Sequence, residues 1–341
     1  MKALVWEAPR VAAMRDQPTP EIAEGEALIR VAYAGICGSE LSGYLGHSAL
    51  RVPPLVMGHE FAGTVAALGS AARLRNPALQ IGQAVTVNPL SSCGRCEFCA
   101  RGVQQLCTQR QLLGAYRPGA YAEHVAVPAE SVVPLPASIG LRIGALAEPL
   151  AVAVRIGELA GSVAGQTMLV IGAGPIGLLV LQVLRVRGVA RVFVADLDAA
   201  RLAMAAALGG EPLNPRERDV VKILREATDG LGAPVTVDAV GTATTRAQCV
   251  AATRSGGTLI LCGLHEETSA MPAAEIIRRE IIVRGTFAYT PANFAAAVAL
   301  LAEGAVRLDP WIVEAPLAEG GRWFDRLIEE PGNVAKVLLI P

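Results

Sequence analysis

The sequence has few aromatic residues and almost no net charge, and these absences exclude several classes of protein. Phe, Trp and Tyr make up 4% of the chain, and the formal net charge is −1. No cluster of Lys and Arg is interleaved with aromatic residues, so the electrostatic footprint of a nucleic-acid or membrane-surface binder is missing. We therefore expect a small-molecule partner, with no nucleic acid and no membrane.

The chain also lacks an uninterrupted apolar run. Its most apolar stretch, 168–184, is broken by Gly172, Gly174, Pro175 and Gly177. A buried strand that leads into a helix explains this pattern better than a membrane span does. The amino terminus meets a charged residue within its first seven positions and has no cleavable apolar core, so we expect a cytoplasmic protein.

A pattern of paired cysteines is missing as well. The chain has seven cysteines, of which four crowd between positions 93 and 107, while Cys37, Cys249 and Cys262 stand apart. An odd count with such clustering indicates metal binding in a reducing compartment rather than disulfides.

The composition that is present indicates an α/β protein of more than one domain. At 341 residues, with 52% hydrophobic residues, 35 Gly and 22 Pro, the chain exceeds the size at which a single core keeps growing. In the first half, short segments of β-branched or aromatic residues alternate with turns, which predicts an antiparallel, barrel-like β domain. Its expected strands are 26–34, 60–68, 83–88 and 121–127.

From about position 150 apolar strands alternate with helical segments such as 201–208. This alternation predicts right-handed βαβ units and a doubly wound parallel sheet. Its expected strands are 168–171, 191–195, 235–239, 258–262 and 281–284. After about position 287 a helix, 291–303, precedes an apolar tail, 334–340, which we expect to return to the first domain and make it discontinuous.

A glycine-rich turn follows the first strand of the second region. Residues 172–177 lead into a leucine-rich helix, and Asp196 ends the next strand, 22 residues beyond Gly174. This is the context that a dinucleotide-binding turn requires, because glycines allow the backbone to approach a pyrophosphate whose charge meets the helix amino terminus. The alternative is a glycine-rich turn with a helix-capping Asp in a protein that binds nothing.

Asp196 favours NAD over NADP. Its carboxylate can accept hydrogen bonds from both adenosine ribose hydroxyls and would repel a 2′-phosphate. Leu197 follows it, where an NADP enzyme would often have an Arg. The expected cofactor-binding residues are Gly172, Gly174, Pro175, Ile176, Gly177, Asp196 and Arg201.

The four clustered cysteines, Cys93, Cys96, Cys99 and Cys107, predict a structural metal site. Spacings of two, two and seven intervening residues can close a tetrahedral zinc shell and leave no open position. Buried free thiols or an iron–sulfur cluster are the alternatives, because tetrahedral thiolate sites also suit iron.

Several motifs occur in the order expected of a medium-chain zinc alcohol dehydrogenase, and the chain most resembles the sorbitol and polyol dehydrogenase branch. They are Gly35–Glu40, Gly58–Glu60, the four-cysteine loop, Glu148–Ala151 and Gly172–Gly177. The resemblance implies a GroES-like β-barrel catalytic domain, built from residues 1–149 and 287–341 with the zinc loop 93–107. A Rossmann NAD-binding domain, 150–286, would lie between these segments. The family also implies a homo-oligomer, a dimer or a tetramer.

The resemblance also implies a catalytic zinc beside the structural one. By position, Cys37 and His59 would be zinc ligands, and Glu60 and Glu148 would supply a carboxylate directly or through water. Ser39 matches the hydroxyl that passes the substrate proton toward solvent. Zinc would lower the pKa of the substrate alcohol, and hydride would pass to the nicotinamide.

Three positions depart from the family pattern. Glu40 stands where the family has an Asp that supports the zinc-bound histidine. Ser42 replaces a frequent His, so proton transfer beyond Ser39 would run through Ser42, the cofactor ribose or water. Ala288 replaces an Arg of sorbitol enzymes, which weakens ordinary sorbitol specificity. The candidates for either pocket lining or core packing are Tyr44, Leu113, Phe287 and Tyr289.

The expected function is therefore hydride transfer between NAD and a secondary alcohol, which would be a polyol, sugar alcohol or diol. Alternatives within the enzyme class are an L-threonine 3-dehydrogenase and a glucose-type sugar dehydrogenase. A dinucleotide-binding sensor that has lost its activity is the alternative from outside that class.

Overall fold

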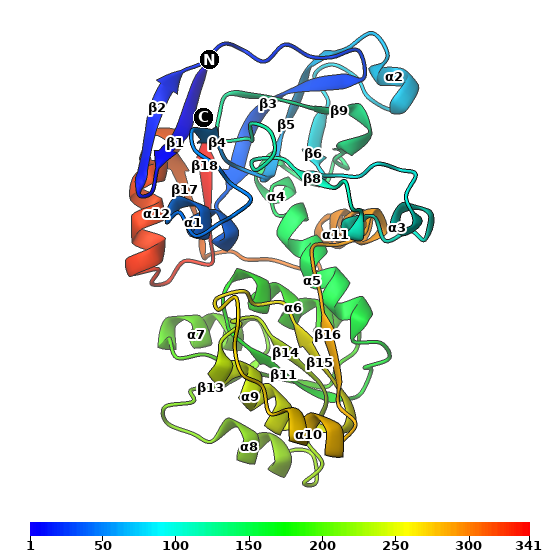
Figure 1. Cartoon of the computed structure of the whole chain (residues 1–341), viewed down its shortest axis with the longest axis vertical. Coiled ribbons are helices and arrows are strands. Elements are labelled where there is room, and N and C mark those ends of the chain that lie inside the picture. Colours follow the sequence, from blue (N-terminus) through cyan, green and yellow to red (C-terminus); the bar gives the residue numbers. More distant parts are fainter. The chain divides into compact units, whose positions relative to one another are not determined.

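The computed structural model describes all 341 residues, which divide into two compact units (Figure 1). The first unit comprises Met1–Glu148, Thr290–Gly304 and Asp309–Pro341, and the second comprises Pro149–Tyr289 and Ala305–Leu308. Both ends of the chain thus contribute to the first unit. Residues 149, 287–289 and 305–308 were expected in the first unit but lie in the second.

The first unit is built around a seven-stranded sheet. Its strand order is β10-β6-β5-β3-β18-β17, and β9 also pairs with β3. These strands are β3 (Glu26–Gly35), β5 (Glu60–Leu68), β6 (Ala84–Val87), β9 (His124–Pro128), β10 (Val132–Pro134), β17 (Ile312–Pro316) and β18 (Lys336–Ile340). Because β18 pairs antiparallel with β3, the carboxyl-terminal tail completes a sheet that begins near the amino terminus.

Smaller elements surround this sheet. The short sheets are β2-β1-β4 and β7-β8, formed by β1 (Lys2–Ala8), β2 (Val11–Asp16), β4 (Leu55–Val56), β7 (Leu90–Ser91) and β8 (Gln111–Leu112). The helices are α1 (Gly38–Tyr44), α2 (Ala72–Arg75), α3 (Glu97–Ala100), α4 (Leu141–Gly144), α11 (Pro291–Ala302) and α12 (Gly320–Glu329). Inward-facing Ile29, Val31 and Phe61 form the core with Tyr121 and Phe324.

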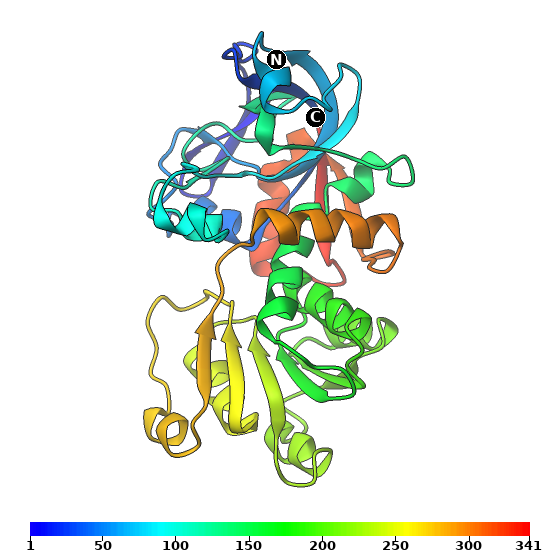
Figure 2. The same cartoon turned by 90° about the vertical axis from the view of Figure 1, so that its right-hand side faces the viewer.

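The second unit contains a six-stranded parallel sheet in the order β13-β12-β11-β14-β15-β16 (Figure 2). The strands are β11 (Thr167–Ile171), β12 (Arg191–Ala195), β13 (Glu211–Leu213), β14 (Ala233–Asp238), β15 (Thr253–Leu261) and β16 (Ile282–Gly285). The chain builds outward from β11 in one direction and then from β14 in the other. This order defines the Rossmann fold.

Helices link these strands: α6 (Pro175–Val186), α7 (Ala199–Ala207), α8 (Val220–Glu226), α9 (Ala243–Ala252) and α10 (Ala273–Arg278), preceded by α5 (Ala147–Leu159). Right-handed crossovers put α6 and α7 on one face and α8, α9 and α10 on the other, because the direction of strand addition reverses. Strand β11 is therefore apolar on both sides, with Val170 facing α6 and Leu169 facing α8 and α9.

Two of the expected strands begin three or more residues from their expected first residue, and the sequence did not predict β1, β2, β4, β7, β8, β10, β13 or β17. Strand β9 begins at His124 rather than at Tyr121, because residues 121–123 bond instead to β1 and to the segment before β5. Strand β15 begins five residues earlier than expected, at Thr253. No helix of the chain combines the length and the apolar character needed to cross a membrane.

Candidate functional site

The first unit brings Cys37, His59 and Glu60 together. Strands β3 and β5 are antiparallel, and Gly35 at the end of β3 lies opposite Glu60 at the start of β5. Cys37 follows β3 by two residues and His59 directly precedes β5, so the register makes them neighbours. Their ligand atoms all lie within 4.8 Å of one another, and His59 and Glu60 are buried. A thiolate, an imidazole and a carboxylate at this spacing can hold a zinc ion.

Glu40 holds the ring of His59. Its Oε1 lies 2.8 Å from His59 Nδ1 and accepts a bond of 2.8 Å from the Gly58 N–H. Its Oε2 accepts from the Cys37 N–H at 3.0 Å and from the Tyr121 hydroxyl. With Nδ1 occupied, Nε2 is the histidine atom left for a metal. Glutamate in place of the family's aspartate therefore still reaches the histidine.

Electrostatic coupling between Glu40 and His59 is strong because both are buried. Burial raises the pKa of Glu40, but the charge of His59 and its hydrogen bond outweigh this effect and lower the pKa to about 2. Burial lowers the pKa of His59, yet the charges of Glu40 and Cys37 bring it well above its usual value. Before metal binds, His59 is thus a cation beside the Glu40 anion, and Zn²⁺ would replace its proton.

Lys336 is a buried cation beside Glu60. Its Nζ donates to Glu60 Oε2 at 2.6 Å and to the Ile36 carbonyl oxygen at 3.0 Å. Burial lowers the pKa of Lys336, but Glu60, Cys37 and Glu148 together raise it above its usual value. A side chain at Gly35 would place Cβ only 2.5 Å from Glu60 Oε2, so glycine leaves room for this carboxylate.

Glu148 lies outside the cluster of Cys37, His59 and Glu60, although it is buried in the same unit and its charge acts on Lys336. Once His59 has lost its proton, the buried carboxylates of Glu40, Glu60 and Glu148 outnumber the buried cations Arg51 and Lys336. A divalent cation would balance these buried charges, so the residues present fit a metal.

Ser39 lies at the edge of this cluster. Its side chain is exposed, and its Oγ donates to Cys37 Sγ at 3.5 Å. Ser42, on the same helix α1, is exposed and belongs to neither metal-binding group. A hydroxyl next to a ligand sulfur is placed to exchange a proton with a molecule bound at the metal position.

The four cysteines of the loop also converge. Cys99 Sγ lies 3.5 Å from Cys96 Sγ and 3.9 Å from Cys93 Sγ, and Cys107 Sγ accepts N–H bonds from Cys93 and Gln109. A tetrahedron with Zn–S bonds of about 2.3 Å has edges of about 3.8 Å, so these separations fit zinc without rearrangement. Backbone N–H groups of Arg95 and Cys96 lower the pKa of Cys93 to about 6.

In the second unit, the glycine-rich turn joins β11 to α6. Gly172 has φ of +103°, and a Cβ on Gly177 would lie 1.8 Å from the Gly172 carbonyl oxygen, so both positions require glycine. A Cβ on Gly174 would meet nothing within 4 Å. Helix α6 begins at Pro175 without a side-chain cap, which leaves the N–H groups of Ile176 and Gly177 for an anion.

Asp196 is tied to this turn. Its Oδ2 accepts the Ala173 N–H at 2.7 Å, and its Oδ1 accepts the Asp198 N–H at 2.9 Å. The parallel register of Ile171 with Ala195 puts the two strand ends side by side. Arg201 lies in the first turn of α7, five residues beyond Asp196.

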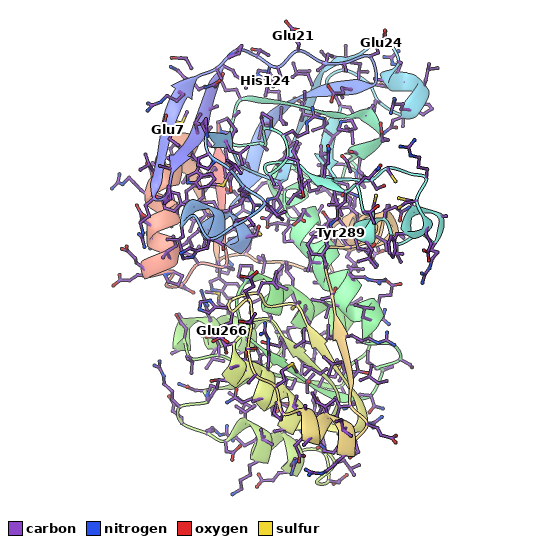
Figure 3. The ribbon with its side chains drawn as sticks, in the orientation of Figure 1. Glu7, Glu21, Glu24, His124, Glu266 and Tyr289 are labelled. Atoms are coloured by element: carbon purple, nitrogen blue, oxygen red, sulfur yellow. The ribbon has the colours of Figure 1, made fainter.

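The remaining candidates lie elsewhere. His124 is on β9, opposite Arg30 (Figure 3), and His47 and His265 are exposed, so only His59 of the four histidines joins a metal-binding group. Tyr44 and Leu113 belong to the core of the first unit. Tyr289 is buried in the second unit, and Phe287 is exposed.

Sequence reasoning missed Arg51, Tyr121 and Lys336. All three are buried, and each bonds to a residue of the Cys37 and His59 site. For Lys336 a signal was available, because a single lysine within an apolar strand predicts a buried partner for its charge. Arg51 and Tyr121 carry no such local signal.

Comparison with known families agrees with this geometry. The alcohol dehydrogenase GroES-like domain matches residues 23–137, and the zinc-binding dehydrogenase domain matches residues 175–303. The chain therefore belongs to the zinc-dependent medium-chain alcohol dehydrogenases. It is an oxidoreductase with a GroES-like unit and a Rossmann unit.

The relatives narrow the family to its polyol-dehydrogenase type. The chain is 32% identical to the D-arabitol-phosphate dehydrogenase of Enterococcus avium, over 99% of this chain and 97% of that protein. It is 33% identical to the D-xylulose reductase A of Aspergillus niger, over 86% and 84%. A structure from Sinorhizobium meliloti 1021, assigned as a zinc-binding dehydrogenase and bound to NADP, has a TM-score of 0.91 and 31% identity, covering 100% of this chain and 99% of that one.

Proposed function

We propose that this enzyme oxidises a secondary alcohol of a polyol, sugar alcohol or diol, with NAD as the hydride acceptor. The observation that carries the proposal is the group of half-buried Cys37 with buried His59 and Glu60, whose ligand atoms lie within 4.8 Å of one another. The relatives named for arabitol phosphate and xylulose support a polyhydroxylated substrate. Ala288 offers no basic side chain that would bind a phosphate group, so a phosphorylated substrate is not favoured.

Cys37, His59 and Glu60 would hold the catalytic zinc, and Glu148 would reach the metal only by a movement or through water. When bound, zinc supplies a Lewis acid that lowers the pKa of the substrate hydroxyl. Glu40 keeps the ring of His59 in place, and Lys336 holds Glu60 by one oxygen. Ser39 accepts the hydroxyl proton as its own proton moves toward solvent.

NAD would bind at the turn that joins β11 to α6. The open side of Gly174 admits the pyrophosphate, the uncapped α6 terminus donates to it, and Asp196 accepts from the adenosine ribose. When bound, the cofactor would supply the hydride acceptor, and Ser39 would accept the hydroxyl proton. A separate zinc on Cys93, Cys96, Cys99 and Cys107 would order the loop without taking part in the reaction.

We also propose a homo-oligomer, either a dimer or a tetramer. Strand β16 at the edge of the Rossmann sheet supports this proposal, because all four of its residues are exposed. Among them are Ile282 and Val283, which are 48% and 38% exposed. An apolar edge strand offers unpaired backbone groups to a second chain.

A substrate panel with metal analysis tests the function. Polyols, 1,2-diols, threonine and glucose are each assayed with NAD and with NADP, and zinc is measured per chain. We expect turnover of a polyol or diol with NAD, and about two zinc ions per chain. Faster turnover of threonine or glucose would show that the proposed polyol or diol class of substrate is wrong. One zinc with NAD binding and no turnover would contradict the catalytic assignment.

A further inference from the structure

Arg51 is a buried cation that touches Ser39 twice. Its Nη1 donates to the Ser39 carbonyl oxygen at 3.0 Å, and its Nη2 donates to Ser39 Oγ at 3.3 Å. Its Nε donates to the Gly114 carbonyl oxygen at 3.3 Å, and the residue is only 4% exposed. All three acceptors are neutral oxygens, so none of the hydrogen bonds of this buried charge goes to a carboxylate, and one goes to the Ser39 hydroxyl.

Helix α1 is shaped to admit this side chain. Ser39 and Gly43 are four residues apart on α1 and therefore lie on the same face. A Cβ on Gly43 would lie 2.8 Å from Arg51 Cδ, so a larger residue there would push the arginine away from Ser39. Burying a charge costs free energy, and this site accommodates it through three hydrogen bonds and a glycine.

We propose that Arg51 is the positioning residue of the Ser39 hydroxyl, a role that rests on the proposed dehydrogenase function. A guanidinium can only donate, so it occupies one lone pair of Oγ and fixes the rotamer of the serine. The second lone pair is left to accept the proton of the substrate hydroxyl. The positive charge also stabilises negative charge that develops on Oγ during transfer.

Proton balance shows where the relay leads. As the substrate proton bonds to Oγ, the proton that Ser39 carried leaves Oγ for an acceptor on the solvent side, and Ser39 is neutral after each turnover. Arg51 has no lone pair to receive that proton, so the exit runs through another acceptor such as Ser42, the cofactor ribose or water. Arg51 therefore acts on the proton transfer by positioning Ser39, while its charge also helps to keep the pKa of the Glu40 carboxyl low.

A double-mutant cycle tests this role. Arg51→Met and Arg51→Lys are made in the wild-type chain and in Ser39→Ala, and kcat, KM, zinc content and melting temperature are measured. We expect Arg51→Met to lower kcat about 10- to 100-fold with a small change in KM, because a misplaced hydroxyl slows proton transfer rather than binding. In Ser39→Ala the same substitution should change kcat less than about 3-fold.

Two further readouts separate positioning from a structural role. The solvent deuterium isotope effect on kcat should rise in Arg51→Met, because proton transfer becomes slower, and guanidinium ions should restore part of kcat in Arg51→Ala. The control is Arg279→Met, which removes a guanidinium that donates to the Val250 carbonyl oxygen in the other unit. This control should leave kcat and the isotope effect unchanged.

The outcomes distinguish this inference from the proposed function. Equal losses from Arg51→Met with and without Ser39, or no loss in an active enzyme, would overturn the role of Arg51 alone. An inactive wild-type enzyme on every alcohol of the panel would overturn both. If Arg51→Met does not fold, Arg51→Lys is used in its place in the double-mutant cycle. An ammonium cannot donate to both Ser39 oxygens in the geometry of the guanidinium fork, so the positioning of Ser39 is still lost.

Discussion

At the scale of single residues, His59 of the proposed metal site depends on partners that would bind no metal. Glu40 accepts four hydrogen bonds, from His59, Gly58, Cys37 and Tyr121. A carboxylate with this many donors has one available position, so it fixes the plane of the imidazole. Mutation of such partners commonly lowers metal affinity by about 10- to 100-fold. Tyr121 can therefore affect zinc binding although it is not itself a ligand.

Tyr121→Phe should weaken zinc binding at the catalytic site. The substitution removes the hydroxyl that donates to Glu40 but keeps the ring in the core beside Phe324. We expect zinc to be lost to a competing chelator at about 10-fold lower chelator concentration, with little change in melting temperature. Tyr116→Phe is the control, because Tyr116 is 54% exposed. Equal zinc retention by the two variants would show that Tyr121 only fills space.

The thiols of the zinc-free chain should differ in reactivity with pH. The pKa of Cys93 is lowered to about 6, so its thiolate fraction should rise through pH 6 and be nearly complete at pH 8. Burial and the charge of Asp238 raise the pKa of Cys262 to about 12, so that thiol stays protonated. Iodoacetamide labelling followed by peptide mass analysis should therefore modify Cys93 with a midpoint near pH 6 and leave Cys262 unmodified.

Bound zinc supplies the control for this measurement. Added Zn²⁺ should protect all four cysteines of the loop at every pH, because each sulfur becomes a ligand. Labelling of Cys93 that is unchanged by zinc would contradict the structural metal site.

At the scale of elements, the turn that joins β11 to α6 contains one glycine that folding requires and another that cofactor binding would require. Gly177 is required because its Cα faces the Gly172 carbonyl oxygen across the turn. Gly174 has open space on the side where a side chain would point. Gly177 is therefore needed for the backbone packing of the turn, and Gly174 for access to it.

Gly177→Ala and Gly174→Ala should therefore fail in different ways. The added methyl group at Gly177 would overlap a backbone oxygen, so we expect a loss of about 3 kcal/mol in the free energy of unfolding, seen as a lower melting temperature. Gly174→Ala should melt like the wild type but bind NAD at least about 10-fold more weakly, because its methyl group occupies the approach of the pyrophosphate. Calorimetry of unfolding and of NAD binding checks both. Equal stability of the two variants would refute this division.

At the scale of the whole molecule, the chain is both an enzyme and a candidate subunit. The exposed edge of β16 is a property of the folded sheet, and its unpaired backbone groups could pair with a second copy. Val283→Lys should shift the protein toward the monomer in size-exclusion chromatography with light scattering. The charge should oppose close approach of two edges. Ile277→Lys is the control, because Ile277 is 74% exposed on α10 and lies outside the strand. An unchanged oligomer in Val283→Lys would move the interface elsewhere.

Local patterns in the sequence determined much of the architecture. Strands β3, β5, β11 and β12 lie at or within one residue of the expected ranges, and α11 begins at the expected residue. These elements follow from apolar periodicity and from glycine and proline at their ends, which act over short distances. The cysteine spacing likewise predicted four sulfurs that converge, because its loop closes over few residues.

Only the tertiary structure decided how the catalytic site is completed. Cys37, His59 and Lys336 are far apart in sequence, and they meet because β3 pairs with β5 on one side and with β18 on the other. The long-range register also brings Tyr121 to Glu40, and tertiary packing brings Arg51 to Ser39. A buried polar or charged group is stable only where its partner arrives in three dimensions, so no local pattern could have named Tyr121 or Arg51 as partners of this site.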